Sequence, residues 1–264
     1  MLELKNITKT FAKGTVNEKT ALSGIDLTLE RGDFVTVLGS NGAGKSTLFG
    51  AIAGTFTPDT GSVILDGKDI TNLPDFKRSK YIGRLFQDPL KGTAPNMTIE
   101  ENLALAYMRA SSHTSPFSMI GKADRADFRE KLSMLGLGLE DRMNSPVGLL
   151  SGGQRQALTL LMATLVTPKL LLLDEHTAAL DPATAEKVLE LTKRIVADNN
   201  ITCLMITHNI PSALSLGNKT IMMNNGSIVM ELSGEERANM TTEKLLHKFH
   251  QQGMSNDRIL FSAE

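Results

Sequence analysis

The segment of residues 39–47 constrains the fold of this chain more than any other part of its sequence. It reads GSNGAGKST and matches the pattern G-x-x-x-x-G-K-[ST], which is typical of a loop that binds phosphate groups. Residues 34–38 before it form an apolar, β-rich run, and residues 45–53 after it continue as a helix. A strand, a glycine-rich loop and a helix in this order predict an α/β fold with a nucleotide-triphosphate site at the loop.

The residue types of the loop explain how it would hold a triphosphate. Glycines let consecutive backbone N–H groups turn inward around the phosphates, where side chains would collide. The helix that follows points its positive end at the same anion. We expect Lys45 to reach the β- and γ-phosphates of the nucleotide and Ser46 to bind Mg²⁺ through its hydroxyl group. The predicted nucleotide-binding residues of the loop are Gly39, Ser40, Asn41, Gly42, Ala43, Gly44, Lys45, Ser46 and Thr47.

An acidic pair, Asp174-Glu175, follows the apolar run of residues 170–173. A buried strand there would lift Asp174 to its carboxyl end, beside the phosphate loop, where the carboxylate can hold the water shell of Mg²⁺. Glu175 then leaves the strand and can polarise an attacking water as a general base. By itself, such a pair is equally well explained as an acidic cap at the end of a strand, so its meaning depends on the phosphate loop.

Composition excludes several classes of protein. The 264 residues include 28 Lys and Arg and 29 Asp and Glu, so the net charge of −1 excludes binding to nucleic acid or anionic lipid by bulk charge. The single cysteine, Cys203, excludes an intrachain disulfide and a thiolate metal cluster. No apolar run approaches the roughly 20 residues of a membrane-spanning helix, and the amino terminus lacks the apolar centre of a signal peptide. We therefore expect a cytosolic protein that reaches a membrane only through a partner.

Strand signals recur along both ends of the chain. Alternating apolar residues predict half-buried strands near residues 2–7 and 25–29, and a short apolar run predicts a buried strand at residues 201–206. The dipeptide Asn225-Gly226 predicts a two-residue hairpin between the apolar runs that flank it. Asp181-Pro182 predicts the start of a helix, with an N-cap and a proline in the first turn.

The middle of the chain carries helix signals instead of strand signals. No strong strand signal appears between about residues 98 and 168. Thr98 and Glu101 form a predicted capping box at the start of a helix. Residues 110–121 are rich in Ser and Thr and predict a loop, and residues 122–135 have helical spacing of apolar side chains. We interpret this region as a helical insertion within an α/β core.

A second anion-binding helix start defines the subclass. Ser151 is a predicted N-cap, and Gly152 and Gly153 after it would expose the first N–H groups of the helix. Together with the phosphate loop and the acidic pair, the segment LSGGQ resembles the ATP-binding subunit of ABC transporters, and the likeness covers about residues 2–232. In that family the signature segment of one subunit completes the ATP site of its partner. The resemblance therefore implies a head-to-tail homodimer, or a pair with a similar subunit, in which Ser151, Gly152, Gly153 and Gln154 bind the partner's ATP.

The resemblance also implies a fold and further site residues. The fold would be a P-loop NTPase core of the RecA-like type with an antiparallel β subdomain and an inserted α-helical subdomain. Gln87 matches the glutamine that contacts Mg²⁺ and the attacking water and that links the site to the membrane subunit. His208 matches the switch histidine that meets the γ-phosphate, although a lone histidine is more often structural. Asp181 belongs to a segment that crosses to the partner, and it also fits a structural role as a helix N-cap.

Two positions differ from the residues that are usual in the family. Phe11 is the candidate for stacking on adenine, where Tyr is commoner in the family, and a core role for this side chain is nearly as well supported. His176 stands where the family usually has a proline after the catalytic glutamate. Loss of the fixed φ of proline can loosen the turn that aims Glu175, and a titratable imidazole can alter the pKa of this base. The third interpretation is a tolerated substitution within a subfamily. The last of these is favoured.

The predicted domains are an ATPase domain over residues 1–234, with the helical subdomain inserted at about 97–168, and a helical tail over 235–264. In the tail, Leu245, Leu246 and Phe249 form an apolar stripe that favours packing on the core. The predicted function is ATP hydrolysis that powers bacterial import of an amino-acid-like solute, with permease subunits and a solute-binding protein as partners. An exporter subunit, or a soluble ABC ATPase that acts on ribosomes or DNA, is the alternative.

Overall fold

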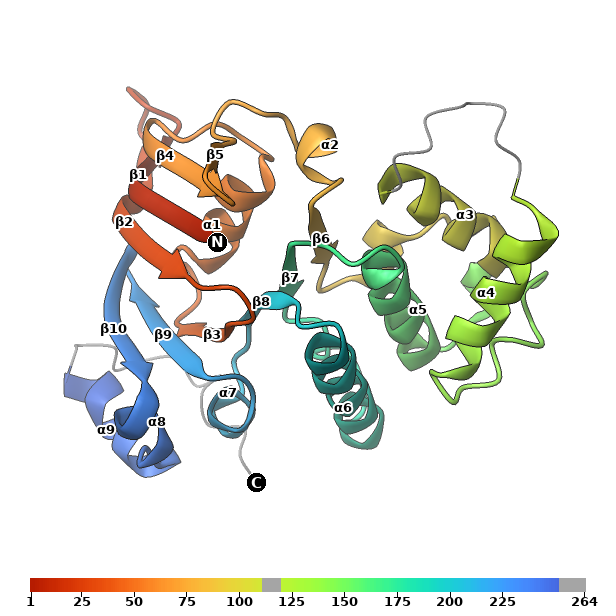
Figure 1. Cartoon of the computed structure of the whole chain (residues 1–264). Helices are drawn as coiled ribbons and strands as arrows, with labels where there is room; N and C mark the ends of the chain where they lie inside the picture. Colours follow the sequence, from red (N-terminus) through yellow and green to blue (C-terminus); the bar gives the residue numbers. More distant parts are fainter. Residues whose placement is uncertain (111–119, 252–264) are drawn as a thin grey trace. The chain divides into compact units, whose positions relative to one another are not determined.

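The computed structural model describes residues 1–110 and 120–251 of the chain. The chain divides into two compact units, which are drawn in Figure 1. Unit 1 contains Met1–Arg78 and Thr202–Glu264, and unit 2 contains Ser79–Ile201. The predicted division into an ATPase domain with a tail stays a prediction.

An antiparallel sheet forms the first part of unit 1. Its strands are β1 (Leu2–Phe11), β2 (Lys19–Leu29), β4 (Thr60–Leu65) and β5 (Lys68–Asp69), in the order β2-β1-β4-β5. Leu2 and Leu4 are buried while Glu3 between them reaches solvent, because successive side chains of a strand point to opposite faces. Ile7 is also buried, after a register shift between Leu4 and Ile7. The two half-buried strands expected near the amino terminus are therefore confirmed.

A second group of strands in unit 1 carries the phosphate loop. It contains β3 (Phe34–Gly39), β8 (Thr202–Ile206), β9 (Lys219–Asn224) and β10 (Ser227–Ser233), in the order β10-β9-β3-β8. β3 is parallel to both β8 and β9, and every residue of β3 is buried, as its largely apolar, β-rich run predicts. β9 and β10 form the hairpin expected at Asn225-Gly226. β2 and β10, far apart in sequence, lie side by side (Figure 1).

Helices complete unit 1. They are α1 (Lys45–Ala53), α2 (Asp75–Arg78), α7 (Ile210–Ser215), α8 (Gly234–Ala238) and α9 (Thr242–Gln251). Leu245 of α9 is fully buried in a cluster with residues of β3, α7, β9 and β10, and Leu246 packs against the same cluster. The predicted packing of the tail on the core is confirmed for these two leucines. The side chain of Phe249 lies outside the described residues.

Unit 2 is mainly helical. Its strands β6 (Ile82–Leu85) and β7 (Leu170–Asp174) are parallel neighbours. Its helices are α3 (Ile99–Ala110), α4 (Lys122–Ser133), α5 (Gly152–Thr164) and α6 (Pro182–Asp198), with short 3₁₀ turns η1 (Pro89–Gly92) and η2 (Val147–Leu149). Thr98 and Glu101 make both bonds of the predicted capping box, and between residues 98 and 168 the described part of the chain contains no extended strand.

The core of the helical region lies among α3, α4 and α5. Leu103, Phe128, Leu132 and Leu158 are fully buried there. Phe128 and Leu132 of α4 have the helical spacing that the sequence predicts, and Leu135, the third residue of that pattern, is partly buried against the same cluster. α4 begins at the expected residue but ends two residues earlier than expected. The predicted loop of residues 110–121 lies mostly outside the described residues. No helix among the residues described is both long and apolar enough to span a bilayer.

Candidate ATP-binding and hydrolysis site

The phosphate loop follows β3 and ends at α1, as the sequence predicts. Gly39, Gly42 and Gly44 have φ values of 151°, 83° and 102°, which side chains rarely adopt. A Cβ at Gly44 would lie 2.6 Å from the carbonyl oxygen of Ala21, so this position also needs the close approach of two backbones. Gly44 is the N-cap of α1 and supplies no side-chain cap, so by helix geometry the first N–H groups stay available to an anion.

Lys45 is held inside the loop. It is 5% exposed, and its Nζ donates to the carbonyl oxygens of Gly39 at 2.6 Å and Ser40 at 2.9 Å. These bonds point the ammonium group into the curve of the loop, where phosphate oxygens would replace or share the carbonyl acceptors. Ser46 is exposed and Thr47 half-buried at the first turn of α1. The loop is thus folded around its own cation.

Two contacts that sequence reasoning missed support the loop. The N–H of Gly226, at the tip of the β9–β10 hairpin, donates to the carbonyl oxygen of Ala43 at 2.9 Å. A Cβ at Gly42 would lie 3.6 Å from Nζ of Lys19 in β2, so a second cation reaches the loop. The dipeptide Asn225-Gly226 predicts a turn, but it does not predict that this turn contacts the phosphate loop. Nothing in the sequence indicates that Lys19 reaches the loop.

His208 lies at the same edge of unit 1 as the phosphate loop. It is half-buried and stands two residues after β8, which pairs in parallel with β3. The N–H of Thr207 donates to the carbonyl oxygen of Val37 at 3.2 Å, so the ends of the two strands stay adjacent. Because carboxyl ends of parallel strands meet at one edge, unit 1 brings His208 and the loop together.

Phe11 ends β1 and is 41% exposed, so the core alternative is not supported. Its ring packs edge-to-face against Phe56 with the centroids 5.4 Å apart, and Nζ of Lys9 lies 5.6 Å from its centroid. Phe11 is the β-sheet partner of Lys19, whose side chain reaches the loop. An exposed aromatic face is therefore available near the phosphate-binding residues.

Unit 2 brings the three other predicted catalytic and metal residues to one edge. Asp174 is the last residue of β7, and Glu175 follows it; both are half-buried. Gln87 is exposed and stands two residues after β6, whose last residue, Leu85, pairs with Leu173 of β7. These side chains therefore leave the carboxyl ends of two neighbouring parallel strands. The sequence predicts this placement for Asp174 and Glu175, whereas the strand before Gln87 was not predicted.

Glu175 has a left-handed backbone, with φ of 46°. Six non-glycine residues of the described chain have positive φ, and four of them are Asn or Asp, which tolerate this region. Glu175 is one of the two that are neither Asn nor Asp. The strain of such a conformation is on the order of 1 kcal/mol and is often found where a residue has a functional role.

His176 is buried, at 3% exposure, and burial lowers its pKa from 6.5 to about 4. The imidazole is therefore neutral near pH 7 and adds no charge beside Glu175. Its Nε2 lies 3.1 Å from Oγ1 of Thr192 in α6. Of the interpretations of this position, an altered pKa of the base by a charged imidazole is not supported at neutral pH.

The helix that starts within the LSGGQ segment, α5, is called the signature helix, and its start differs from that of α1. Oγ of Ser151 accepts from the N–H of Gln154 at 3.2 Å, and Oε1 of Gln154 accepts from the N–H of Ser151 at 3.2 Å, which makes a full capping box. The N–H groups of Gly152 and Gly153 have no acceptor within the helix by its geometry. Gly153 is buried against Thr184 of α6, and a Cβ there would collide with that side chain, so this position needs a glycine.

The predicted N-cap of α6 is confirmed. Oδ1 of Asp181 accepts from the N–H of Thr184 at 3.1 Å. Hydrogen bonds from the side chain and the backbone of Thr184 lower the pKa of Asp181. Leu180, beside it, lies 3.3 Å from the position of a Cβ on Gly152. The segment expected to cross to a partner therefore adjoins the signature helix in unit 2.

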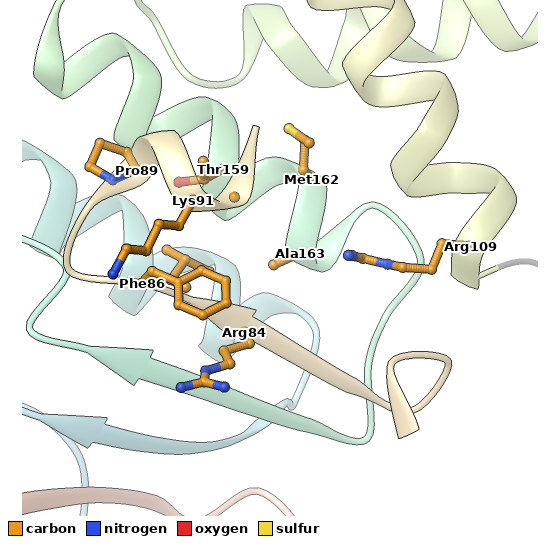
Figure 2. Close-up of a pocket in the computed structure, with 10 residues that line it drawn as sticks. Arg84, Phe86, Pro89, Lys91, Arg109, Thr159, Met162 and Ala163 are labelled. Atoms are coloured by element: carbon orange, nitrogen blue, oxygen red, sulfur yellow. The ribbon is translucent and has the colours of Figure 1, made fainter. Parts of the chain in front are cut away.

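A pocket of about 110 Å³ in unit 2 adjoins Gln87 in sequence, since Phe86 and Pro89 on either side of that residue line it. Figure 2 shows Arg84, Lys91 and Arg109 around it, with Arg109 extending from the end of α3 toward Ala163 of α5. The guanidinium of Arg84 lies 4.6 Å from the ring centroid of Phe86. Of the described residues that line the pocket, none is acidic.

Comparisons with known proteins agree with this arrangement. The family model for the ABC transporter domain matches residues 22–178. The tyrosine transport ATP-binding protein of Clostridioides difficile is 42% identical over 249 residues, which cover 94% of this chain and 98% of that protein. The methionine import ATP-binding protein MetN of Corynebacterium glutamicum is 35% identical, and the chain spans 61% of its length.

Solved structures give the same class. The dimeric ATP-binding cassette MJ0796, in a post-hydrolysis state with ADP and phosphate, has a TM-score of 0.77 and 31% identity, covering 88% of this chain and 98% of that one. The ADP conformation of MJ1267, an ABC transporter cassette, has a TM-score of 0.75 and 29% identity, covering 95% and 98%. The fold is therefore that of a P-loop ATPase cassette. The chain belongs to the ABC transporter family and is an ATP-binding, ATP-hydrolysing cassette.

Proposed function

We propose that this chain powers a bacterial importer of an amino-acid-like solute. The likeness to the tyrosine transport protein, which extends over nearly all of both chains, carries this proposal. A methionine import protein is a further relative. An ATP-binding cassette does not itself contact the transported solute, so the solute class rests on these relatives and not on the geometry of the site.

The complete ATP site would contain two copies of the chain, arranged head to tail. Lys45 and the loop of one copy would hold the phosphates, and the free N–H groups of Gly152 and Gly153 of the other would meet the γ-phosphate. The capping box supports this role because it uses Ser151 and Gln154 and leaves these two donors to a ligand. A dimeric relative with ADP and phosphate bound gives independent support.

The residues offered for Mg²⁺ suit that ion. Ser46, Gln87 and Asp174 would supply a hydroxyl, an amide and a carboxylate oxygen, and Mg²⁺ prefers oxygen ligands. In the described ranges no group of three or more His, Cys, Asp and Glu side chains is arranged to hold a metal ion. The three oxygen donors of Ser46, Gln87 and Asp174 fit a cation that takes its other ligands from substrate phosphates and water. When bound, the ion would neutralise charge on the phosphates.

Hydrolysis would then follow from the remaining groups. Glu175 would orient and deprotonate the water that attacks the γ-phosphorus in line with the leaving oxygen, while His208 would contact a γ-phosphate oxygen. Lys45 would stabilise the charge that develops on the β- and γ-oxygens. Loss of the γ-phosphate would remove the group that joins the two copies, so they would separate.

A permease would dock beside Gln87 on unit 2 and attach the subunit to the cytoplasmic face of the membrane. The pocket next to Gln87 supports this because it combines Phe86 and Met162 with the cations Lys91 and Arg109. Such a lining suits a short permease segment with an apolar side chain and an acidic one. Movement of this segment would couple closure of the two copies to transport, and a solute-binding protein would deliver the solute outside.

Replacing Glu175 with Gln tests the assignment of the base. We expect hydrolysis to fall about 10²- to 10⁴-fold because the proton acceptor is lost, while ATP binding persists and holds the dimer closed. Steady-state phosphate release and size-exclusion chromatography with ATP measure both effects. Glu186→Gln, an exposed acid on α6, is the matched control and keeps full turnover. A Glu175→Gln variant that hydrolyses ATP at the unmodified rate would refute this role.

The transport assignment is tested separately. We expect the chain to co-purify with a membrane permease, and the gene for a solute-binding lipoprotein to lie beside its own. Reconstituted with that permease and binding protein in vesicles, the chain should drive ATP-dependent uptake of a labelled amino acid. Efflux from the vesicles would contradict import, and purification without any membrane protein would favour a soluble ABC ATPase.

A further inference from the structure

The turn that carries Glu175 is attached to α6 by a side-chain contact outside the ATP-binding residues. His176, the next residue, is 3% exposed, and Thr192 is fully buried. Nε2 of His176 and Oγ1 of Thr192 are 3.1 Å apart, a distance that a hydrogen bond between a ring nitrogen and a hydroxyl takes. This contact joins the end of β7 to the third turn of α6.

The direction of this hydrogen bond follows from a second one. Oγ1 of Thr192 donates to the carbonyl oxygen of Val188 at 2.7 Å, four residues earlier in α6. A hydroxyl group has a single hydrogen, so Thr192 has only lone pairs left for His176. Nε2 of His176 must therefore carry a hydrogen and donate it to Thr192.

The backbone before His176 needs such an anchor. Glu175 has φ of 46°, and its carbonyl oxygen accepts from the N–H of Ala178 at 3.0 Å, which closes a tight turn. A left-handed conformation at a residue other than Gly, Asn or Asp persists only where the surroundings hold it. The bond from His176 to α6 supplies a fixed point one residue after the strained one.

We propose that His176 and Thr192 are a positioning pair that fixes the direction of Glu175 for hydrolysis. This proposal rests on the proposed role of Glu175 as the base. Both side chains are buried, so both would act through the turn. A proline at position 176 would restrict the same turn through its ring. Here a side-chain hydrogen bond to a neighbouring helix would do so instead.

A double-variant cycle tests the pair. We expect Thr192→Val, which keeps the shape and removes the acceptor, to lower kcat for ATP hydrolysis about tenfold, because small errors of alignment weaken catalysis strongly. The Kd for ATP should change less than about twofold, since the pair is remote from the phosphate loop in the sequence and lies in unit 2. Thr192→Ser, which keeps the hydroxyl, should restore kcat. His176→Pro should stay within a few-fold of the unmodified rate, and Thr192→Val should have no further effect in that background.

Matched controls separate positioning from stability. Thr164→Val removes a comparable hydroxyl, which donates to the carbonyl oxygen of Leu160 at 2.8 Å in α5, and should leave kcat unchanged. Thr192→Val alone leaves Nε2 of His176 buried without its acceptor, and this can prevent folding. In that case the double variant His176→Pro/Thr192→Val, which lacks the imidazole, is compared with His176→Pro. An additive loss of kcat in the two variants, or an unchanged kcat in Thr192→Val, would overturn the pairing. Glu175→Gln is assayed in parallel: retention of hydrolysis there would refute the base instead.

Discussion

The two helix starts that we expect to bind the phosphates of ATP are built differently. In unit 1, α1 follows a loop whose glycines curl the backbone around a buried lysine, and its N-cap, Gly44, offers no side-chain acceptor. In unit 2, α5 starts with the reciprocal bonds of Ser151 and Gln154, and its free donors are the N–H groups of Gly152 and Gly153. The first start provides a full charge and an enclosing loop, whereas the second provides only neutral donors at a capped helix end.

This difference predicts an order of events. A loop with a buried ammonium group can bind a triphosphate within one copy, because charge-assisted hydrogen bonds are the stronger ones. A capped helix end with two free N–H groups adds the modest attraction of a helix dipole and needs a phosphate already in place. ATP should therefore bind to unit 1 first, and the signature helix of a second copy should close on it afterwards.

The largest effect should follow from removing the charge in unit 1. Lys45→Ala should weaken ATP binding about 100-fold, since hydrogen bonds from a charged group contribute roughly 1.5–3 kcal/mol. Hydrolysis should fall to background. Isothermal titration with ATP measures the change, and Lys244→Ala, a surface lysine of the same unit, is the control. Undiminished affinity in Lys45→Ala would remove the distinction between the two starts.

The buried imidazole should make unit 2 sensitive to pH. The pKa of His176 falls from 6.5 in the unfolded chain to about 4 in the folded one, so the unfolded state binds more protons between these values. Its contribution to the free energy of unfolding is complete above pH 6.5 and is lost as the pH falls toward 4, by up to about 3 kcal/mol.

Urea denaturation of the protein without nucleotide or metal, at pH 7 and at pH 4.5, measures this loss. The His176→Pro protein should show a smaller decrease over the same interval because it lacks the titrating group. Equal decreases in both proteins would contradict the neutral, hydrogen-bonded state of His176.

A smaller effect is expected at the adenine end of unit 1. Phe11→Ala should weaken ATP binding about fivefold, which is near the lower end of the 1–3 kcal/mol for stacking a base on an aromatic ring. Phe11→Tyr should bind like the unmodified protein because it keeps the ring. Titration with ATP and with triphosphate lacking a base separates stacking from phosphate binding. Equal losses for both ligands would assign Phe11 a purely structural role.

Local features of the fold were predictable because their causes lie within a few residues. The phosphate loop depends on its own glycines and Lys45, and the caps at Thr98, Ser151 and Asp181 each depend on a partner three residues later. β7 is an unbroken apolar run that can only be buried. In each case the sequence contains both the group and its partner.

Features that depend on distant contacts were not predictable. β6 was missed because Gly83 and Arg84 interrupt its apolar pattern, and the structure shows why glycine stands there: a Cβ would lie 2.7 Å from the carbonyl oxygen of Ala163. The bond between Gly226 and Ala43 and the bond between His176 and Thr192 likewise join residues whose proximity only the folded chain creates. His176 was notable in the sequence, but its partner was not.

Mixing two impaired proteins tests most directly whether the sites are shared between copies. The Lys45→Ala protein keeps an intact signature helix, and a Ser151→Phe protein, altered at an exposed position, keeps an intact phosphate loop. Each alone should hydrolyse ATP only at background rates. In a mixed dimer, one site unites the two intact halves, so the mixture should regain hydrolysis that is maximal near equal amounts. A mixture that stays as inactive as its components, or a Ser151→Phe protein that is fully active alone, would contradict a site built from two chains.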